Sequence, residues 1–231
     1  MSVLTVTKHH GLGNDFLVAL DQPVDGALAR ALCDRHRGIG ADGLIGAYVD
    51  GMYVTFELYN SDGSRAEVSG NGLACLAQAV GRDRIEVRTD AGVRGVTLDL
   101  DRATVDMGAP ITIKEMEGGF FVDMGNPHLV LRDEGQDLET VGRQHLDLNV
   151  ELIAPVADGV RMRVHERGAG VTEACGSGAC ASAVAAHKWG IAGERITVHQ
   201  DGGDATVDLA GDTIRYTVTV VYIARIEAPC P

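Results

Sequence analysis

The chain has 231 residues, of which 45% are hydrophobic, so it is long enough to bury a core in one sizeable domain or two small ones. Its 33 acidic residues against 20 basic ones give a net charge of −13, which disfavours contact with nucleic acid or an anionic membrane surface. No run approaches the roughly 20 apolar residues of a membrane span, and Met1–Gly13 lacks a signal-peptide core, so we expect a cytoplasmic protein.

The first half of the chain predicts short strands, glycine turns and two helices. Residues 25–36 have apolar side chains at helical spacing, and residues 38–43 match GxGxxG. A dinucleotide-binding fingerprint needs a strand before it and a helix after it, whereas here the order is reversed, so we expect a structural turn. Strands are predicted at residues 3–7, 16–20, 44–49, 52–59, 84–89, 93–100 and 103–107.

Two glycine-rich turns each begin an alanine-containing helix. Ser69 precedes the turn whose helix runs to residue 80, and Cys175 precedes the turn whose helix runs to His187. A thiol just before a helix start lies at the positive end of the helix dipole, so we expect the Cys175 thiolate to be favoured. We expect the other cysteines to be mostly buried thiols in a reducing compartment: Cys33, Cys75, Cys180 and Cys230.

The order of these landmarks repeats along the chain. Gly125-Asn126 echoes Gly13-Asn14 at an offset of 112 (125 − 13), and Cys175 echoes Ser69 at an offset of 106 (175 − 69). Two unrelated landmarks that recur in the same order indicate an internal duplication. We therefore predict an α+β fold of two pseudo-symmetric lobes, formed by residues 1–109 plus 218–231 and by residues 110–217. The second lobe ends in predicted strands at 195–200, 204–209 and 213–223.

A pair of facing helix starts would suit one small anionic ligand. Each start offers unpaired backbone N–H groups, for which a carboxylate is the natural partner. We expect the active site in the cleft between the lobes, with the side chains of Ser69 and Cys175 on opposite faces of the ligand's α-carbon. Such a layout removes a proton from one face and returns one to the other, which inverts the stereocentre.

Several motifs, in order over nearly the whole chain, resemble the diaminopimelate epimerase family. The resemblance implies strands wrapped around a central helix in each lobe. It also implies a cofactor-independent epimerase that interconverts LL- and meso-2,6-diaminopimelate, an intermediate of lysine and peptidoglycan synthesis. The matching runs are HGLGNDF with Asn14, NSDGS with Asn60, Gly70-Asn71-Gly72, Gly125-Asn126-Pro127-His128, Asn149, Glu166-Arg167-Gly168 and Ala174-Cys175-Gly176-Ser177-Gly178.

The resemblance also assigns roles to individual residues. It makes Cys175 and Ser69 the catalytic pair, with His128 and Glu166 tuning its protonation, and it places Tyr222 at the interface of a homodimer. It implies neither metal nor cofactor; no matching Cys/His pair stands near Cys175 and Cys180, and no lysine motif suggests pyridoxal phosphate. The residues implied in substrate binding are Asn14, Asn60, Gly70, Asn71, Asn126, Asn149, Glu166, Arg167, Gly176 and Ser177.

Two positions depart from the family's pattern, and the chain is short for the family. Ser69 stands where the family has its first catalytic cysteine, and Gly43 stands where some members have glutamine. A hydroxyl is a far weaker acid than a thiol, so activity reduced or confined to one direction is expected. Three hypotheses stay open here: an epimerase, with Ser69 either natural or introduced in place of cysteine; a single-base lyase or dehydratase of the proline racemase-like type; and a pseudoenzyme that binds an amino acid without turnover.

Overall fold

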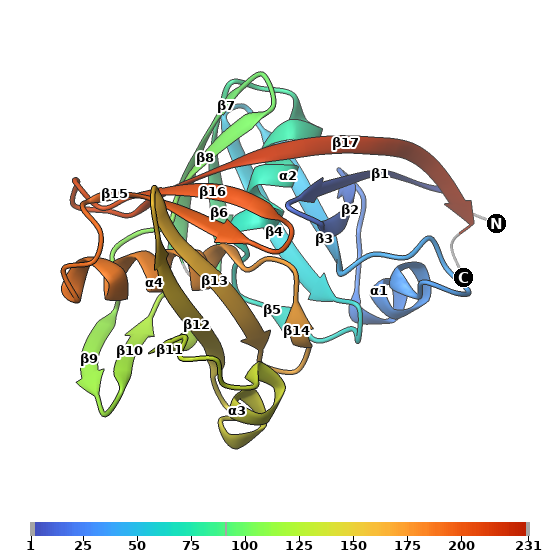
Figure 1. Cartoon of the computed structure of the whole chain (residues 1–231). Helices are drawn as coiled ribbons and strands as arrows, with labels where there is room; N and C mark the ends of the chain where they lie inside the picture. Colours follow the sequence, from blue (N-terminus) through green and yellow to red (C-terminus); the bar gives the residue numbers. More distant parts are fainter. Residues whose placement is uncertain (1–2, 91, 230–231) are drawn as a thin grey trace. The chain divides into compact units, whose positions relative to one another are not determined.

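A computed structural model describes residues 3–90 and 92–229 (Figure 1). The chain forms two compact units, one from residues 1–105 and 219–231 and the other from residues 106–218. The division expected from the sequence differs from these limits by a few residues at each end. Cys230 lies outside the described residues.

The first unit contains two helices and most of the strands expected there. Its order is β1 (Val3–Gly11), β2 (Asn14–Leu20), α1 (Gly26–Cys33), β3 (Gly43–Asp50), β4 (Tyr53–Asn60), β5 (Arg65–Ala66), α2 (Gly70–Val80), β6 (Arg84–Thr89), β7 (Gly92–Asp99) and β8 (Arg102–Asp106), the last residue of which belongs to the second unit. The helix expected at residues 25–36 is shorter, because Asp25 caps its start and the chain leaves helical geometry at Asp34.

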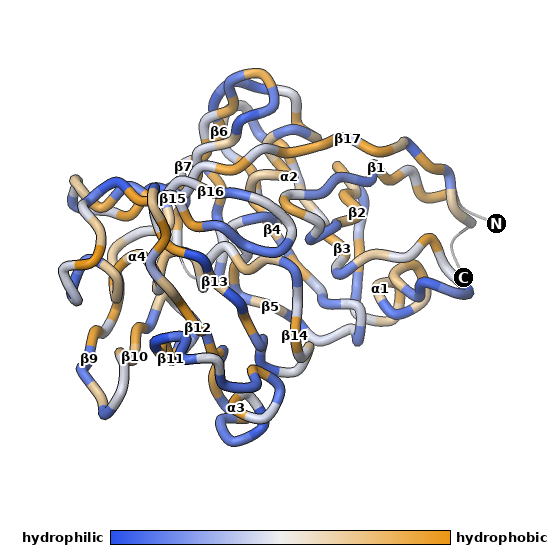
Figure 2. Tube along the Cα trace, in the orientation of Figure 1, coloured by the Kyte–Doolittle hydropathy of each residue, from blue (hydrophilic) through white to orange (hydrophobic). Residues whose placement is uncertain are grey.

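The second unit repeats this plan. Its order is β9 (Thr112–Met116), β10 (Gly119–Asp123), β11 (Pro127–Arg132), α3 (Leu138–Gln144), β12 (Asn149–Val156), β13 (Gly159–Glu166), β14 (Gly170–Thr172), α4 (Gly176–Lys188), β15 (Arg195–Gln200), β16 (Gly203–Asp208) and β17 (Arg215–Pro229). The start of β17 pairs with β16; from residue 219 onward the strand belongs to the first unit, where residues 220–229 pair with β1. In Figure 2 the middle of β17 is mainly hydrophobic and its end more hydrophilic.

Strand pairing confirms the duplicated α+β architecture. In the first unit β2 is parallel to β3, β3 antiparallel to β4, β4 parallel to β6, and β6 antiparallel to β7. The second unit has the same sequence of pairings for β11, β12, β13, β15 and β16. The two halves therefore share one pairing scheme, which is the strongest sign of duplication.

Each unit packs its strands around one helix. The helix α2 contacts β1, β2 and β7, while α4 contacts β10, β11, β12 and β13. Leu73 and Leu76 of α2 are fully buried, which stabilises the unit by about 1.5–3 kcal/mol each. In α4 the buried face consists of small residues, so the strands approach the helix closely. Both helix starts are held inside their own units as a result.

Candidate active site

The Cys175 side chain forms the N-terminal cap of α4. The backbone of Cys175 is extended (φ −136°, ψ 116°), and its sulfur accepts a hydrogen bond from the Gly178 N–H at 3.4 Å. The Ser177 hydroxyl lies 3.6 Å from the same sulfur, and the Cys175 N–H donates to the side-chain oxygen of Gln200 at 2.8 Å. Only 5% of Cys175 is exposed. The thiol is therefore fixed by backbone and side-chain contacts within its own unit.

The environment of Cys175 favours the thiol rather than the thiolate. Burial raises its pKa well above the ordinary value, and the carboxylates of Glu166 and Glu151 raise it further. Hydrogen bonds from Ser177 and Gly178 offset only part of this rise. The favoured thiolate predicted from the helix start is thus wrong for this structure, because desolvation and two carboxylates outweigh the helix start. Cys175 holds its proton until a base removes it.

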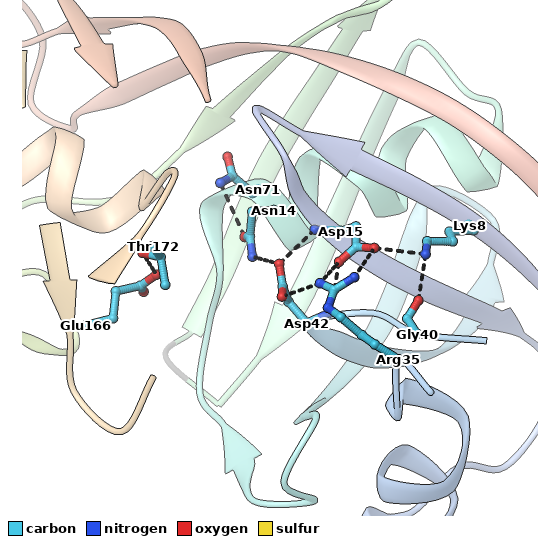
Figure 3. A network of polar contacts seen from close by, with 9 residues as sticks. All are labelled: Lys8, Asn14, Asp15, Arg35, Gly40, Asp42, Asn71, Glu166 and Thr172. Carbon is cyan, nitrogen blue, oxygen red and sulfur yellow. Dashed lines mark hydrogen bonds and ion pairs between the residues drawn. The ribbon is translucent and has the colours of Figure 1, made fainter. Parts of the chain in front are cut away.

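Glu166, at the end of β13, is the acceptor best placed for that proton. Burial raises the pKa of Glu166, while hydrogen bonds from Thr172 and Cys175 lower it in part. The Thr172 hydroxyl donates to the Glu166 carboxylate at 2.6 Å, as Figure 3 shows. A carboxylate with a raised pKa is a better match for a proton near neutral pH. Glu166 can therefore exchange a proton with Cys175.

A second polar group lies deeper behind the helix start. His128 and Glu151 are fully buried, and His128 Nδ1 is 2.6 Å from a Glu151 carboxylate oxygen. The other ring nitrogen, Nε2, is 3.0 Å from the Asn126 side-chain oxygen. The Asn126 amide nitrogen donates to the Ser177 hydroxyl at 3.1 Å. These contacts join the buried pair to the group that touches the Cys175 sulfur.

Asn149 holds the loop beside this chain of contacts. Its amide nitrogen donates to the Pro127 carbonyl at 3.0 Å, and its side-chain oxygen accepts from the Arg167 N–H at 3.0 Å. Asn149 is buried, whereas the Arg167 side chain is exposed. Of the binding residues expected in this unit, Asn149 thus has a side-chain amide fixed by hydrogen bonds, whereas Arg167 has a charged side chain that faces solvent.

Ser69 has the corresponding place in the first unit. Its backbone is extended (φ −142°, ψ 124°), and its hydroxyl oxygen accepts from the Gly72 N–H at 3.0 Å. Ser69 and Cys175 are therefore both N-caps whose side chain accepts from the N–H three residues on. Gly70 and Asn71, the next two residues, are buried at the helix start. The equivalence inferred from the sequence offset agrees with this local geometry.

Asn14 is held in one orientation by groups of its own unit (Figure 3). Its amide nitrogen donates to the Asp42 carboxylate at 2.8 Å, and its oxygen accepts from the Asn71 amide at 3.3 Å. A carboxylate only accepts, so the contact with Asp42 settles which end of the Asn14 amide points toward it. Asp42 is thus the group that orients this candidate binding residue.

Asp15, Lys8 and Arg35 form a charge cluster that contacts Asp42. Asp15 lies 2.9 Å from the Lys8 ammonium and 2.8 Å from the Arg35 guanidinium, which also reaches Asp42 at 2.8 Å. Burial alone would raise the pKa of Asp15, but hydrogen bonds and charges from Arg35 and Lys8 reverse the effect and lower it. This charge cluster, which Figure 3 shows beside Asn14, fixes the loop that carries the amide.

Three further positions complete the set named from the sequence. Asn60 is exposed at the end of β4, where it pairs with Gly43 and donates to the Ser64 hydroxyl at 3.0 Å. A Cβ on Gly43 would lie 3.0 Å from the Tyr59 carbonyl, so glycine suits the packing there. Tyr222 is 52% exposed on β17, with its ring 5.4 Å from that of His9.

Four contributors were not identified from the sequence. Asp42 lies in the stretch assigned to a turn, and Glu151 lies within an apolar strand; the others are Thr172 and Gln200. No motif marked these residues. For Glu151 the signal comes from the repeat: the equivalent position in the first half is an isoleucine, so the acidic side chain departs from the repeat.

Neither a metal cluster nor a membrane-spanning helix occurs in the part of the chain that the structure describes. Within residues 3–90 and 92–229, no three His, Cys, Asp or Glu side chains group as metal ligands would. Over the same residues, no helix has the length and apolar character needed to cross a bilayer.

Comparison with known proteins gives one family. The family model described as diaminopimelate epimerase matches residues 6–113 and 120–223. A diaminopimelate epimerase of Synechocystis sp. is 37% identical over 94% of this chain and 95% of its own length. Another, of Heliobacterium modesticaldum, is 36% identical over 96% of this chain and 98% of its own length.

A solved structure shares the fold at much lower identity. The phenazine biosynthesis protein PhzF family structure from Enterococcus faecalis has a TM-score of 0.76 over 99% of this chain and all of its own, at 12% identity. At that identity the likeness is one of fold.

Proposed function

The chain belongs to the diaminopimelate epimerase family, and from this premise we propose that it interconverts LL- and meso-2,6-diaminopimelate by proton transfer at the α-carbon. Family membership makes the chain an isomerase, an epimerase of the type that works without pyridoxal phosphate. The substrate and the residue roles are our proposal. The observation that carries it is Cys175, a buried thiol capping α4 with a carboxylate partner.

In the proposed mechanism Cys175 removes or supplies one of the two exchanged protons. The raised pKa of the thiol means that a base must first take its proton, and after burial the charge of the Glu166 carboxylate is the largest cause of that rise. Proton transfer from the sulfur to the Glu166 carboxylate forms the thiolate, which then abstracts the α-proton. The backbone N–H groups at the start of α4 favour a substrate carboxylate beside the sulfur.

Ser69 is proposed as the second proton-transfer position. Its hydroxyl can donate a proton to a carbanion, but it is too weak an acid to provide a standing base at neutral pH. The hydroxyl accepts one N–H bond, and among the hydrogen bonds of the described residues Ser69 has no carboxylate partner. Exchange of the α-proton that starts with abstraction by Cys175 is therefore expected to be faster than exchange that starts with abstraction at position 69.

The remaining roles follow the family pattern. We propose that the reacting carboxylate binds at the two helix starts and that the distal amino-acid end is held by amides and charged side chains. The proposed carboxylate-binding residues are Gly70, Asn71, Gly176 and Ser177, and the other proposed binding residues are Asn14, Asn60, Asn126, Asn149, Glu166 and Arg167. The orientation of Asn14 by Asp42 and of Asn126 by His128 supports fixed recognition of polar groups.

We further propose that the protein is a cytoplasmic homodimer. The four cysteines described by the structure are all free thiols, which suits a reducing compartment. Tyr222 is exposed on β17 beside Val221 and Ile223, which are also exposed. An exposed apolar strand of this kind favours pairing with a second copy.

The test is isotope exchange in heavy water. Each diaminopimelate isomer is incubated with the protein, and deuterium at the α-carbon and the stereochemistry of the product are followed by NMR and chiral chromatography. Deuterium uptake with inversion supports the epimerase; loss of water or ammonia would identify a lyase, and no exchange at all would identify a non-catalytic binder.

Matched variants locate the chemistry. Cys175→Ala is expected to abolish exchange. Cys180→Ala, which changes a fully buried thiol of the same helix, is expected to leave exchange within about twofold of the unaltered chain, because Cys180 has no polar role in the proposal. Equal loss in both variants would contradict the assignment of Cys175.

A further inference from the structure

We propose that Gln200 is a positioning residue for Cys175: its side-chain oxygen holds the Cys175 N–H and so fixes the direction in which the thiol leaves the helix start. The inference deepens the proposed function and rests on it, since Cys175 is the proton-transfer group in that proposal. Gln200 contacts the backbone of Cys175, whereas Ser177 and Gly178 contact its sulfur. It therefore acts through the placement of the cysteine.

The chemistry of the contact settles which way the Gln200 amide is turned. A backbone N–H only donates, so the atom that faces it at 2.8 Å is the oxygen Oε1, and Nε2 lies at the other end of the amide. Gln200 is 7% exposed, and its Nε2 is buried without a hydrogen-bond partner within residues 3–90 and 92–229. The side chain thus spends its acceptor on the residue that carries the thiol.

Stability gives little reason for a glutamine at this place. An apolar side chain of the same length would leave the Cys175 N–H without this acceptor, but it would also remove Nε2, a buried donor that has no partner within the described residues. An unpaired buried donor costs folding free energy in either case. The two arrangements therefore cost a similar amount, and what Gln200 adds is the placement of Cys175.

Hydrogen bonds hold the Cys175 backbone on both sides of its α-carbon. The Cys175 carbonyl accepts from the Ala179 N–H at 2.9 Å, in the first turn of α4. The Gln200 oxygen holds the N–H on the other side. A residue has only two soft backbone rotations, φ and ψ, so holding both ends sets the direction of the side chain. Without Gln200, the peptide group before Cys175 is free to turn and carry the thiol with it.

The turn that follows Gln200 holds the same segment at a second point. The Gly202 N–H donates to the Glu173 carbonyl at 2.9 Å, two residues before Cys175. Both contacts come from the end of the β15–β16 hairpin, within the second unit. The hairpin therefore anchors the segment that leads into the helix start.

This hairpin is itself held in place by its neighbours. Gln200 pairs with Gly203 across the two strands. His199, the residue before Gln200, has its Nδ1 2.7 Å from an Asp204 carboxylate oxygen and its Nε2 3.0 Å from an oxygen of Asp158. Asp158 lies between β12 and β13, so the contact ties the hairpin to another turn of the unit. Gln200 thus projects from a fixed support.

The repeat has a shorter side chain at the equivalent point of the first unit. Thr89 pairs with Gly92 across the β6–β7 hairpin. Gln200 pairs with Gly203 in the same way, at an offset of 111 for both members of the pair (200 − 89 and 203 − 92). The Thr89 hydroxyl donates to the Gly92 carbonyl at 2.7 Å, within its own hairpin. The long acceptor therefore occurs in the unit whose helix start carries the thiol.

Placement matters because proton transfer depends steeply on geometry. A shift of about 1 Å in a reacting group can lower a rate on the order of 100-fold. The N–H groups proposed to bind the substrate carboxylate belong to Gly176 and Ser177 in α4, whereas Gln200 contacts the residue before the helix. Loss of the Gln200 contact should therefore slow the chemical step and leave substrate binding nearly unchanged.

The test replaces Gln200 by methionine, which has nearly the same length and no oxygen. The assay is α-proton exchange in heavy water for the diaminopimelate isomer that exchanges faster, which the proposed function assigns to abstraction by Cys175. In Gln200→Met, kcat should fall about ten- to hundredfold, with KM within about twofold. The melting temperature should change little, because one unpaired buried donor replaces another. An unchanged kcat, or a change in KM alone, would overturn the proposal.

Gln22→Met is the matched control. The Gln22 oxygen accepts from the Thr5 N–H at 3.1 Å, and its Nε2 donates to the Thr5 carbonyl at 2.9 Å, so the change removes a glutamine contact to the backbone far from Cys175 in the sequence. It should lower the melting temperature at least as much as Gln200→Met, since here the donor is paired as well, yet leave kcat within about twofold. An equal fall in kcat in both variants would show general disturbance and refute the positioning role.

A second readout does not depend on turnover. Cys175 is 5% exposed, so iodoacetamide reaches its thiol when the helix start opens locally. Loss of one hydrogen bond should make that opening more frequent, so Cys175 should be alkylated about fivefold faster in Gln200→Met. Cys180, fully buried in the same helix, should keep its rate. No rise at Cys175, or an equal rise at both cysteines, would contradict the proposal.

A measurement on the unaltered chain covers the case in which Gln200→Met does not fold. NMR should show a coupling across the hydrogen bond between the Cys175 ¹⁵N and the side-chain carbonyl ¹³C of Gln200, and its absence would refute the contact. If the alkylation and coupling results hold and diaminopimelate is not epimerised, the proposed function fails alone. If epimerisation is seen and they do not hold, the positioning role fails alone.

Discussion

Replacing Asp15 by a neutral residue is expected to destabilise the first unit far more than the same replacement of an exposed aspartate that pairs with arginine. The Asp15 side chain is 9% exposed, and that of Lys8 is 16% exposed, so Asp15→Asn leaves a nearly buried ammonium without its anion. Breaking a buried pair costs about 3–5 kcal/mol. Arg35 is 54% exposed and keeps Asp42, which lowers the expected loss to about 2–3 kcal/mol.

The assay is urea unfolding, with Asp90→Asn as the matched control. Asp90 pairs with Arg65, and both side chains are about half exposed, at 48% and 47%, so this change should cost less than about 1 kcal/mol. The free energies of unfolding are compared with one common slope of free energy against urea concentration, so that the difference reflects stability and not a change in the unfolded state. A cost for Asp15→Asn no larger than that for Asp90→Asn would refute the reasoning.

The pH dependence gives an independent check on the same residue. The pKa of Asp15 is lowered in the folded chain, so its contribution is complete above the unfolded value of about 3.9 and is lost as the pH falls through the folded value. The difference in the free energy of unfolding between the unaltered chain and Asp15→Asn should therefore be constant from about pH 6 to 8, which lies above the unfolded pKa. It should narrow in acid below about pH 4.

Two further predictions concern packing and assembly. A Cβ at Gly178 would lie 2.6 Å from a Glu151 oxygen, whereas one at Gly72 would come no closer than 3.1 Å to Ser69. Gly178→Ala should therefore lower the melting temperature more than Gly72→Ala. Equal shifts in melting temperature would contradict the role of Glu151 as a close neighbour of Gly178. Tyr222→Asp should convert the proposed dimer to monomer in analytical ultracentrifugation, and an unchanged mass would remove β17 from the interface.

The sequence predicts the helices that carry the site because their turns are local signals. Ser69 and Cys175 both stand before glycine-rich starts, and the N-cap geometry follows from neighbouring residues alone. The sequence prediction names no strand at β12 or β13, the central strands of the second unit; only the repeat of the first half implies strands there. The short helix α3 carries an Asp137 cap but too few turns to show a period.

The polar partners of the site could not be predicted in the same way. Glu151 lies in a strand, where an acidic residue is ordinarily expected to face solvent, and its partner His128 is 23 residues away. Only the parallel register of β11 and β12 brings them together. Asp42 likewise reaches Asn14 through the register of β2 and β3. Long-range pairing, and not any local motif, creates both contacts.

The pKa of Cys175 shows the limit of reasoning from a single helix start. The dipole and the unpaired backbone N–H groups of a helix start, taken alone, favour a thiolate. The folded chain buries the thiol and places Glu166 and Glu151 close by, so the pKa rises. The reactive form of Cys175 therefore depends on transfer of its proton, which links the cysteine to Glu166 in any account of turnover.

The central claim is that position 69 is the second proton-transfer position, opposite in role to Cys175. The most direct measurement compares the epimerisation rates of LL- and meso-diaminopimelate for the unaltered chain and for Ser69→Cys. A thiol can act as base and as acid near neutral pH, so epimerisation at least about tenfold faster is expected in both directions, because the equilibrium constant fixes the ratio of the two rates. Unchanged rates in both directions, with Cys175→Ala inactive, would contradict it.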